Sequence, residues 1–216
     1  MSKSIMIIGA GPAIGHGVAE KFGNEGWSIV LAARNPERLA EEAAALSAKG
    51  ITVHTVPVDA TDPIALRAAI ARGDELTEGL TVVHFNAAVV RIQDLFSMTD
   101  AEVTSDLAIN VAAGLHTIRT AVGLFGDRGG TILVTGGGIA TKPNANALSL
   151  GVGKVAMRHA VEALVKPLAE RGIRIATATV REKIVPNSRE SADVADLIWE
   201  LATNPAAPWE LDYRTL

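Results

Sequence analysis

The stretch Ile5-Met-Ile-Ile-Gly9-Ala-Gly11-Pro-Ala-Ile-Gly15-His-Gly17 decides the fold of this chain. A short apolar run ends at Ile8, glycines follow, and helical apolar spacing begins at Val18. This order predicts a strand, a tight turn and a helix. Backbone N–H groups at the start of such a helix converge on one point and favour a phosphate group there. A strand-turn-helix unit without a ligand is the alternative interpretation.

Composition narrows the class of protein. The 216 residues suit one α/β domain, and a hydrophobic content of 48% supports a full core. The absence of cysteine excludes disulfides and thiolate chemistry. A net charge of −4 argues against a nucleic-acid surface. No apolar run long enough for a membrane span is free of charge or glycine. The start of the chain does not resemble a cleaved signal sequence. We therefore expect a cytoplasmic protein with no membrane partner.

Strand and helix patterns alternate along the whole chain. We expect strands over 5–8, 28–33, 52–58, 81–85, 130–135 and 173–180, a short one near Leu211, and helices over 36–48, 63–72, 99–125, 146–170 and 191–203. Repeated βα units imply a parallel sheet with helices on both faces and ligand loops at the carboxyl ends of the strands. The predicted fold is therefore α/β: one Rossmann-like, doubly wound parallel sheet of six to seven strands, in a single domain over 1–216.

The glycine spacing points to a particular family. Gly9-x-Gly11-x-x-x-Gly15 departs from the fingerprint G-x-G-x-x-G, because Ile14 stands at the third glycine position. It resembles the loop T-G-x-x-x-G-x-G of the short-chain dehydrogenase/reductase family, with Ile8 in place of the usual Thr. The resemblance implies a nicotinamide cofactor bound by the loop residues Gly9, Gly11, Ala13, Ile14 and Gly15.

The end of the second strand bears on which cofactor binds. It reads Ala32-Ala33-Arg34, with no acidic residue where NAD-preferring sheets carry one. The guanidinium of Arg34 has the donor geometry to bind a 2′-phosphate, and this end resembles that of the NADP-preferring members of the family. We therefore expect NADP rather than NAD. A solvated arginine at the start of the next helix is the alternative.

Further cofactor residues follow from the resemblance alone. Asp59, after the third strand, matches an Asp that contacts adenine in the family. Phe85-Asn86-Ala87-Ala88 looks like a changed N-N-A-G motif, in which Asn86, Ala87 and Ala88 lie against the cofactor. Ile184 matches the residue whose backbone meets the nicotinamide amide.

The catalytic residues of the family are only partly present. Asn110 and Lys154 match the family Asn and the Lys of Y-x-x-x-K. Leu150 stands at the Tyr position, and Gly137, thirteen residues earlier, stands where the family has Ser. A positioned general acid contributes roughly 10²–10⁴ in rate. We therefore expect reduction of ordinary ketones to be very slow.

No other polar residue clearly replaces the lost hydroxyls. Ser149 neighbours the Tyr position, but one residue along a helix is about 100° of rotation, so it should face elsewhere. For Thr135 and His84 a structural role is the simpler interpretation. The backbone of Gly136–Gly138 either binds an oxyanion or, as we favour, only lets the chain pass close to the cofactor.

Two functions fit these observations. The first is an NADP(H)-dependent oxidoreductase acting on an unknown small carbonyl compound with a weakened acid–base site. The second is a non-catalytic NADP(H)-binding sensor or interaction subunit. Only about ten residues, 181–190, connect the sixth strand to the last helix. The substrate lid of the family is therefore shortened here, and we expect the site to be open or to be closed by a partner subunit. Family members commonly pair the helices that match 101–125 and 146–166 here, which predicts a homodimer or homotetramer.

Overall fold

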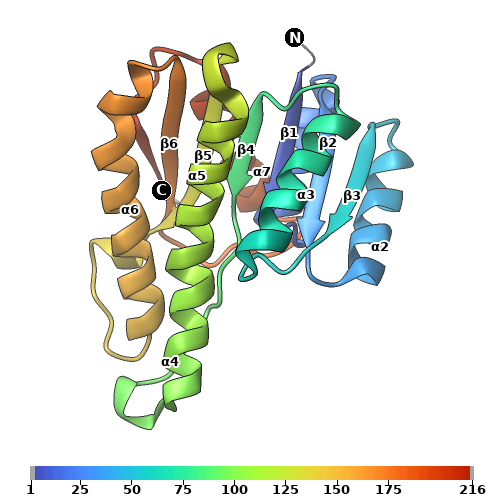
Figure 1. Cartoon of the computed structure of the whole chain (residues 1–216). Coiled ribbons are helices and arrows are strands. Elements are labelled where there is room, and N and C mark those ends of the chain that lie inside the picture. Colours follow the sequence, from blue (N-terminus) through green and yellow to red (C-terminus); the bar gives the residue numbers. More distant parts are fainter. Residues whose placement is uncertain (1–2, 215–216) are drawn as a thin grey trace.

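The computed structural model describes residues 3–214, in which strands and helices alternate (Figure 1). The strands are β1 Ser4–Ile8, β2 Ser28–Ala33, β3 Val53–Pro57, β4 Val82–Phe85, β5 Gly130–Gly137, β6 Ile173–Val180 and β7 Glu210–Tyr213. The helices are α1 Ile14–Asn24, α2 Pro36–Ser47, α3 Pro63–Leu76, α4 Asp100–Leu107, α5 Ala113–Phe125, α6 Leu148–Ala169 and α7 Arg189–Thr203. The predicted single α/β domain is confirmed.

The seven strands form one parallel sheet in the order β3-β2-β1-β4-β5-β6-β7. The order changes direction between β1 and β4, so the connections leave these two strands toward opposite edges of the sheet. In such sheets the crevice beyond the carboxyl ends at this point binds ligands. The topology therefore places the loops after Ile8 and after Phe85 side by side.

Helices cover both faces of the sheet, which explains its apolar strands. In β1, Ile5 and Ile7 face a cluster shared with α1, α2 and α7. Met6 and Ile8 face the opposite cluster, shared with α3, α5 and α6. Figure 1 shows α3, α5 and α6 in front of the sheet, and α4 extending beyond the carboxyl ends of the strands.

Local capping fixes where several helices begin. Asn35 and Asp62 cap α2 and α3, and each is followed by proline at the first helical position. Thr99 and Glu102 form a capping box at the start of α4. Between α4 and α5 the helix widens into a π turn over Ala108–Ala112.

Several predicted element ends were wrong. β5 continues beyond Thr135 to Gly137, because Gly136 and Gly137 pair with Thr179 and Val180 of β6. α3 runs four residues past Arg72, to Leu76, and α6 starts at Leu148 rather than at Asn146. The first two glycines of the triplet are thus part of the sheet and not a free loop.

A buried ion pair anchors the long loop after β4. Arg91 donates through Nε to Asp106 Oδ2 at 2.9 Å, and Ser149 Oγ donates to the same oxygen at 2.8 Å. Burial alone would raise the pKa of Asp106, but these hydrogen bonds hold it below its usual value. The loop, α4 and the start of α6 are thereby tied together. The side chain of Ser149 faces α4, as its place on the helix predicts.

Candidate functional site

A long cleft runs across the carboxyl ends of the central strands. One part, of about 220 Å³, is lined by the ends of β1, β2 and β4 and by residues after β3. A larger part, of about 850 Å³, is lined by the glycine loop, the ends of β5 and β6, and α6. The two parts meet at Asn86 and Ala88, which line both. The cleft therefore spans the carboxyl ends of β1, β2, β4, β5 and β6.

The glycine loop forms one wall of the cleft in a conformation that demands glycine. Gly9 has φ +89°, and a Cβ there would lie 2.4 Å from the backbone N of Ala87. At Gly15 a Cβ would lie 3.0 Å from Ala10 Cα. α1 starts beside the cleft, and its N-cap, Ala13, offers no side-chain cap to the first amides. These amides and the helix dipole are suited to a pyrophosphate.

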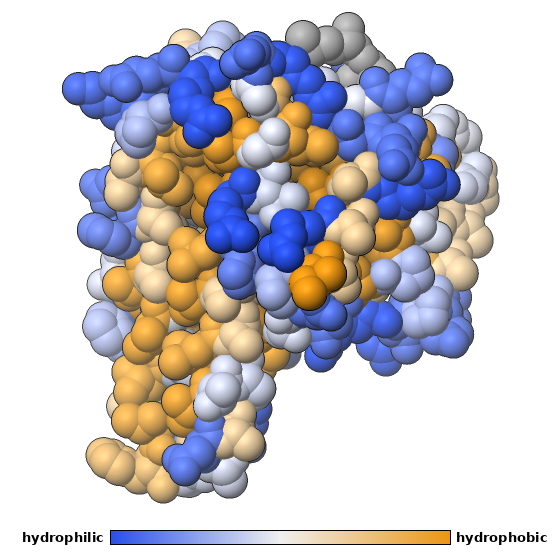
Figure 2. Space-filling view, in the orientation of Figure 1, coloured by the Kyte–Doolittle hydropathy of each residue, from blue (hydrophilic) through white to orange (hydrophobic). Residues whose placement is uncertain are grey.

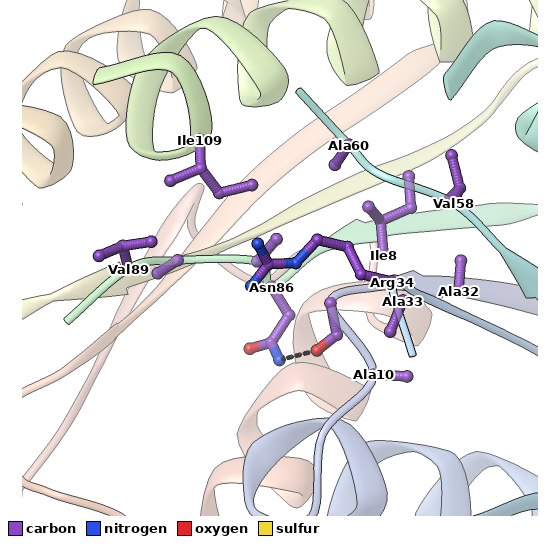
Figure 3. A pocket seen from close by; sticks show the side chains of 13 residues that line it. Ile8, Ala10, Ala32, Ala33, Arg34, Val58, Ala60, Asn86, Val89 and Ile109 are labelled. Atoms are coloured by element: carbon purple, nitrogen blue, oxygen red, sulfur yellow. Dashed lines mark hydrogen bonds between the residues drawn. The ribbon is translucent and has the colours of Figure 1, made fainter. Parts of the chain in front are cut away.

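Most predicted cofactor residues line this cleft. Gly9, Arg34, Asn86, Ala87 and Ala88 line the smaller part, and Gly11, Ala13, Ile14, Gly15, Lys154 and Ile184 line the larger part, together with Gly137 and Leu150. Figure 3 shows the side chain of Arg34 reaching from the end of β2 across the smaller part. The structure thus brings these residues from six separate segments of the chain to one site.

Asp59 and Asn110 have structural partners of their own. The Asp59 carboxylate accepts hydrogen bonds from the backbone N and the hydroxyl of Thr61, which lower its pKa, while its neighbours Val58 and Ala60 line the cleft. Asn110 lies in the π turn, where its amide donates to Val89 O at 3.1 Å and accepts from Val89 N at 2.9 Å. Asn110 therefore holds the loop after β4 against the helix.

A hydrogen-bond chain that sequence reasoning missed links the strand ends. Thr135 Oγ1 donates to Asn86 Oδ1 at 2.8 Å, so its remaining contact, His84 Nε2 at 2.8 Å, must be a donor to it. Asn86 Nδ2 in turn donates to Gly9 O at 2.9 Å (Figure 3). The chain joins β4 and β5 to the glycine loop. Its only sequence signal is a histidine within the apolar strand 82–85.

The ring of His84 is neutral in the folded protein. It is fully buried, and its Nδ1 has no hydrogen-bond partner among the described residues. Burial, with a smaller contribution from Lys154, lowers the pKa of His84 from 6.5 to about 3. The Nε2–H group of His84 donates to the hydroxyl oxygen of Thr135, and this contact orients the hydroxyl hydrogen of Thr135 toward Asn86.

Lys154 lines the larger part of the cleft. Its Nζ donates to the backbone oxygen of Thr135 at 2.7 Å, and its burial lowers its pKa to about 8. Leu150, one helical turn earlier, lines the same part. A Cβ on Gly137 would lie 3.4 Å from Lys154 Cγ, so the lysine stem covers the position where the family has Ser.

The segment after β6 forms the rim of the cleft. Residues 181–188 connect β6 to α7 without a helix. Arg181 Nη2 donates to both carboxylate oxygens of Asp212, at 3.0 and 2.9 Å, and Nη1 donates to Thr141 at 2.9 Å. This second arrangement was also missed, because its partners are far apart in the sequence. It fixes the direction of the chain beside Gly138.

Comparison with known proteins agrees with this geometry. The family model described as short chain dehydrogenase matches residues 3–181. This chain belongs to the short-chain dehydrogenase family. Members of this oxidoreductase family use nicotinamide cofactors.

Individual relatives are distant. The chain is 28% identical over 180 residues to oxidoreductase UcpA of Escherichia coli, covering 80% of this chain and 66% of that protein. It is 26% identical over 200 residues to 2,3-dihydro-2,3-dihydroxybenzoate dehydrogenase of Bacillus subtilis, covering 92% and 73%. A short-chain dehydrogenase structure from Rhodopseudomonas palustris superposes with a TM-score of 0.89 at 24% identity, covering 99% of each chain. The fold thus persists although the sequences have diverged.

A nicotinamide dinucleotide fits the residues present. The glycine cradle at Gly9 and the uncapped start of α1 suit its pyrophosphate. The small residues Ala87 and Ala88 leave room along the floor of the cleft. Lys154 lies beyond them as a donor to a hydroxyl group. The bound cofactor would supply a hydride to a substrate at the larger part of the cleft.

The neutral His84 makes a prediction about stability and pH. The unfolded chain binds a proton at this ring below about pH 6.5, whereas the folded protein does so only near pH 3. Stability is therefore lost as the pH falls between these values, by about 1.4 kcal/mol for each pH unit from this group. We expect His84→Leu to be less sensitive to acid, measured as the free energy of unfolding in urea at several pH values.

A matched control separates this ring from other acid effects. His54→Leu removes a partly exposed histidine of β3 and should leave the pH dependence of the native protein unchanged. If His84→Leu and the native protein lost stability in parallel between pH 6.5 and 3, the buried neutral ring would be the wrong account.

Proposed function

We propose that the chain is an NADP(H)-preferring oxidoreductase that reduces a small carbonyl compound. The observation that carries the cofactor preference is Arg34, whose side chain reaches across the cleft at the strand end where Ala33 replaces an acidic residue (Figure 3). Arg38 lies in an adjoining hollow with Arg34. A related metagenomic short-chain oxidoreductase, 22% identical with a TM-score of 0.89, was solved in complex with NADP.

The chemistry that the cleft supports is hydride transfer with weak acid assistance. Leu150 and Gly137 bring no hydroxyl to the place where the substrate oxygen would lie. Loss of one such donor costs on the order of 3 kcal/mol in related chemistry. The favoured substrates are therefore activated carbonyl compounds, whose reduction depends less on a strong acid.

The same two residues favour a second candidate function. A protein that binds NADP(H) without turnover would act as a redox sensor or as an interaction subunit. It would bind the cofactor tightly and selectively while showing no hydride transfer to quinones, diketones or aldehydes. Turnover with any of these compounds would support the oxidoreductase function and exclude the non-catalytic one.

The exposed side of the helices favours assembly into a homodimer or homotetramer. Leu107, Leu115, Val152 and Val155 are 37–49% exposed on α4, α5 and α6. Figure 2 shows an apolar band over these helices. By length and composition alone, Asp100–Arg128 could cross a membrane, but its inner side packs in the core of this fold. We propose that a second copy covers the outer side.

Replacing Arg34 tests the cofactor proposal. Hydrogen bonds to charged groups contribute roughly 1.5–3 kcal/mol, so Arg34→Ala should weaken NADPH binding by about 10- to 100-fold and leave NADH binding nearly unchanged. Nicotinamide fluorescence in a titration measures both. Arg67→Ala, an exposed arginine of α3, is the control and should change neither affinity. Equal NADPH and NADH affinities in the native protein would contradict the preference.

Solution mass tests the oligomer. The native chain should sediment at no less than twice its 22.5 kDa, that is 45 kDa. Val155→Glu places a charge in the proposed interface and should yield the single-chain mass. Ile64→Glu changes a 70% exposed apolar residue on α3, outside the interface, and should keep the native mass. A native mass of 22.5 kDa would refute the assembly.

A further inference from the structure

The larger part of the cleft combines an apolar wall with one partly buried cation, Lys154. Val90 and Ile92 come from the loop after β4, Ile139 follows β5, and Leu150 lies on α6. We call these four residues the apolar wall. Lys154 lies one helical turn beyond Leu150 and lines the same space. A substrate in this space would thus meet hydrocarbon side chains and, at the inner end beside Thr135, the ammonium group of Lys154, while Lys183 lies at the exposed rim.

The ammonium of Lys154 has donors to spare. It carries three N–H bonds, and one of them donates to Thr135 O at 2.7 Å. Among the residues that the structure describes, no other acceptor for Lys154 Nζ is found. One remaining N–H suits the ribose of the cofactor, as the family resemblance implies. The last one is available to a substrate oxygen.

The other polar groups of the cleft are poorly suited to donate a proton. The Thr135 hydroxyl already donates to Asn86. The Arg181 guanidinium is held by Asp212, and a guanidinium does not release a proton near neutral pH. Glu182 and Lys183 lie in the connection after β6, at the exposed rim. Lys154 is therefore the best placed acid at the inner end.

The surroundings of Lys154 also allow it to titrate near neutral pH. Burial lowers its pKa to about 8. His84 lies behind Thr135 on the side of the sheet and is neutral. Asp106, on α4, is already paired with Arg91. The charged groups on the remaining side are those of the rim: Arg181 with Asp212, Glu182 and Lys183.

We propose that Lys154 is the catalytic acid of this cleft and that the substrate is an apolar, electron-poor carbonyl compound such as an ortho-quinone. This inference rests on the proposed oxidoreductase function. The reduced cofactor would supply a hydride: its C–H bond would break, leaving the cofactor oxidised, as a new C–H bond forms at the carbonyl carbon and the π electrons of the C=O bond move to oxygen. That oxygen takes a proton from Lys154 Nζ, whose N–H electron pair stays on nitrogen. The neutral amine then regains a proton from water.

The first test needs no cofactor. Para-nitrophenol is an aromatic probe that fits an apolar site. Its ionised form, the phenolate, is an oxyanion that absorbs visible light. A nearby ammonium should lower the apparent pKa of the bound probe by about one unit, and Lys154→Met should abolish this shift. Lys154→Arg keeps a cation and should retain this shift. Lys49→Met, which removes an exposed lysine outside this part of the cleft, should behave as the native protein does. An unchanged shift in Lys154→Met would overturn the proposal.

The second test is the pH dependence of turnover with phenanthrenequinone and saturating NADPH. Because the ammonium is the donor, the rate should fall as the pH rises through about 8. Lys154→Arg should lose at least about 100-fold in rate and also lose this fall, since a guanidinium cannot supply the proton. A native rate and pH profile in Lys154→Arg would overturn the assignment.

The two tests separate this inference from the proposed function. Failure of NADPH to bind the native protein would remove the oxidoreductase function, while the probe still shows whether the ammonium of Lys154 stabilises an oxyanion. If the native protein binds NADPH and turns over, but Lys154→Met keeps the full probe shift, the proposed function holds and the assignment of Lys154 as the catalytic acid is wrong.

Discussion

The site depends on one hydrogen-bond chain that runs from the sheet interior to the glycine loop. His84 donates to Thr135, Thr135 to Asn86, and Asn86 to the backbone oxygen of Gly9. The backbone carbonyl of Thr135 also accepts a hydrogen bond from Lys154 Nζ. Thr135 therefore positions both parts of the cleft: its hydroxyl holds the glycine loop through Asn86, and its backbone oxygen holds the lysine of the larger part. Because every member is buried or partly buried, a break in the chain leaves unpaired polar groups, which are costly.

This arrangement explains how the cofactor frame persists without the usual catalytic hydroxyls. The frame rests on backbone conformation, small residues and the Thr135 contacts, none of which involves Leu150 or Gly137. Leu150 and Gly137 instead line the larger part of the cleft. There Leu150 extends the apolar wall, and Gly137 lets the stem of Lys154 lie against β5. The binding of the cofactor and the donation of a proton are thereby separable properties of the cleft.

The sequence predicted the fold well because its signals are local. Apolar runs, glycine turns and caps such as Thr99 act within a few residues, and they place nearly every element. The end of β5 was missed because glycine favours a loop by propensity, while pairing with β6 decides otherwise. Asn110 was singled out by its match to the family Asn, but its partner, Val89, lies 21 positions away along the chain and cannot be read from the sequence.

The candidate site was predictable only where a family pattern marks it. The glycine loop, Arg34 and Lys154 follow such patterns and lie together in the cleft. The His84 and Arg181 contacts join segments about 30 to 50 positions apart without any motif, so only the three-dimensional structure reveals them. The depressed pKa of Lys154 likewise arises from burial, which depends on the packing of α6 over β5.

The most direct test of the account restores both missing hydroxyls. The account predicts that Gly137→Ser combined with Leu150→Tyr leaves NADPH affinity unchanged and raises the rate of reduction of a simple ketone by about 10²–10⁴. The rate is measured as NADPH oxidation with saturating cofactor. A native protein that already reduces simple ketones as fast as the double variant would contradict the claim that the frame is intact and the acid chemistry weakened. So would a double variant that binds NADPH but gains no activity.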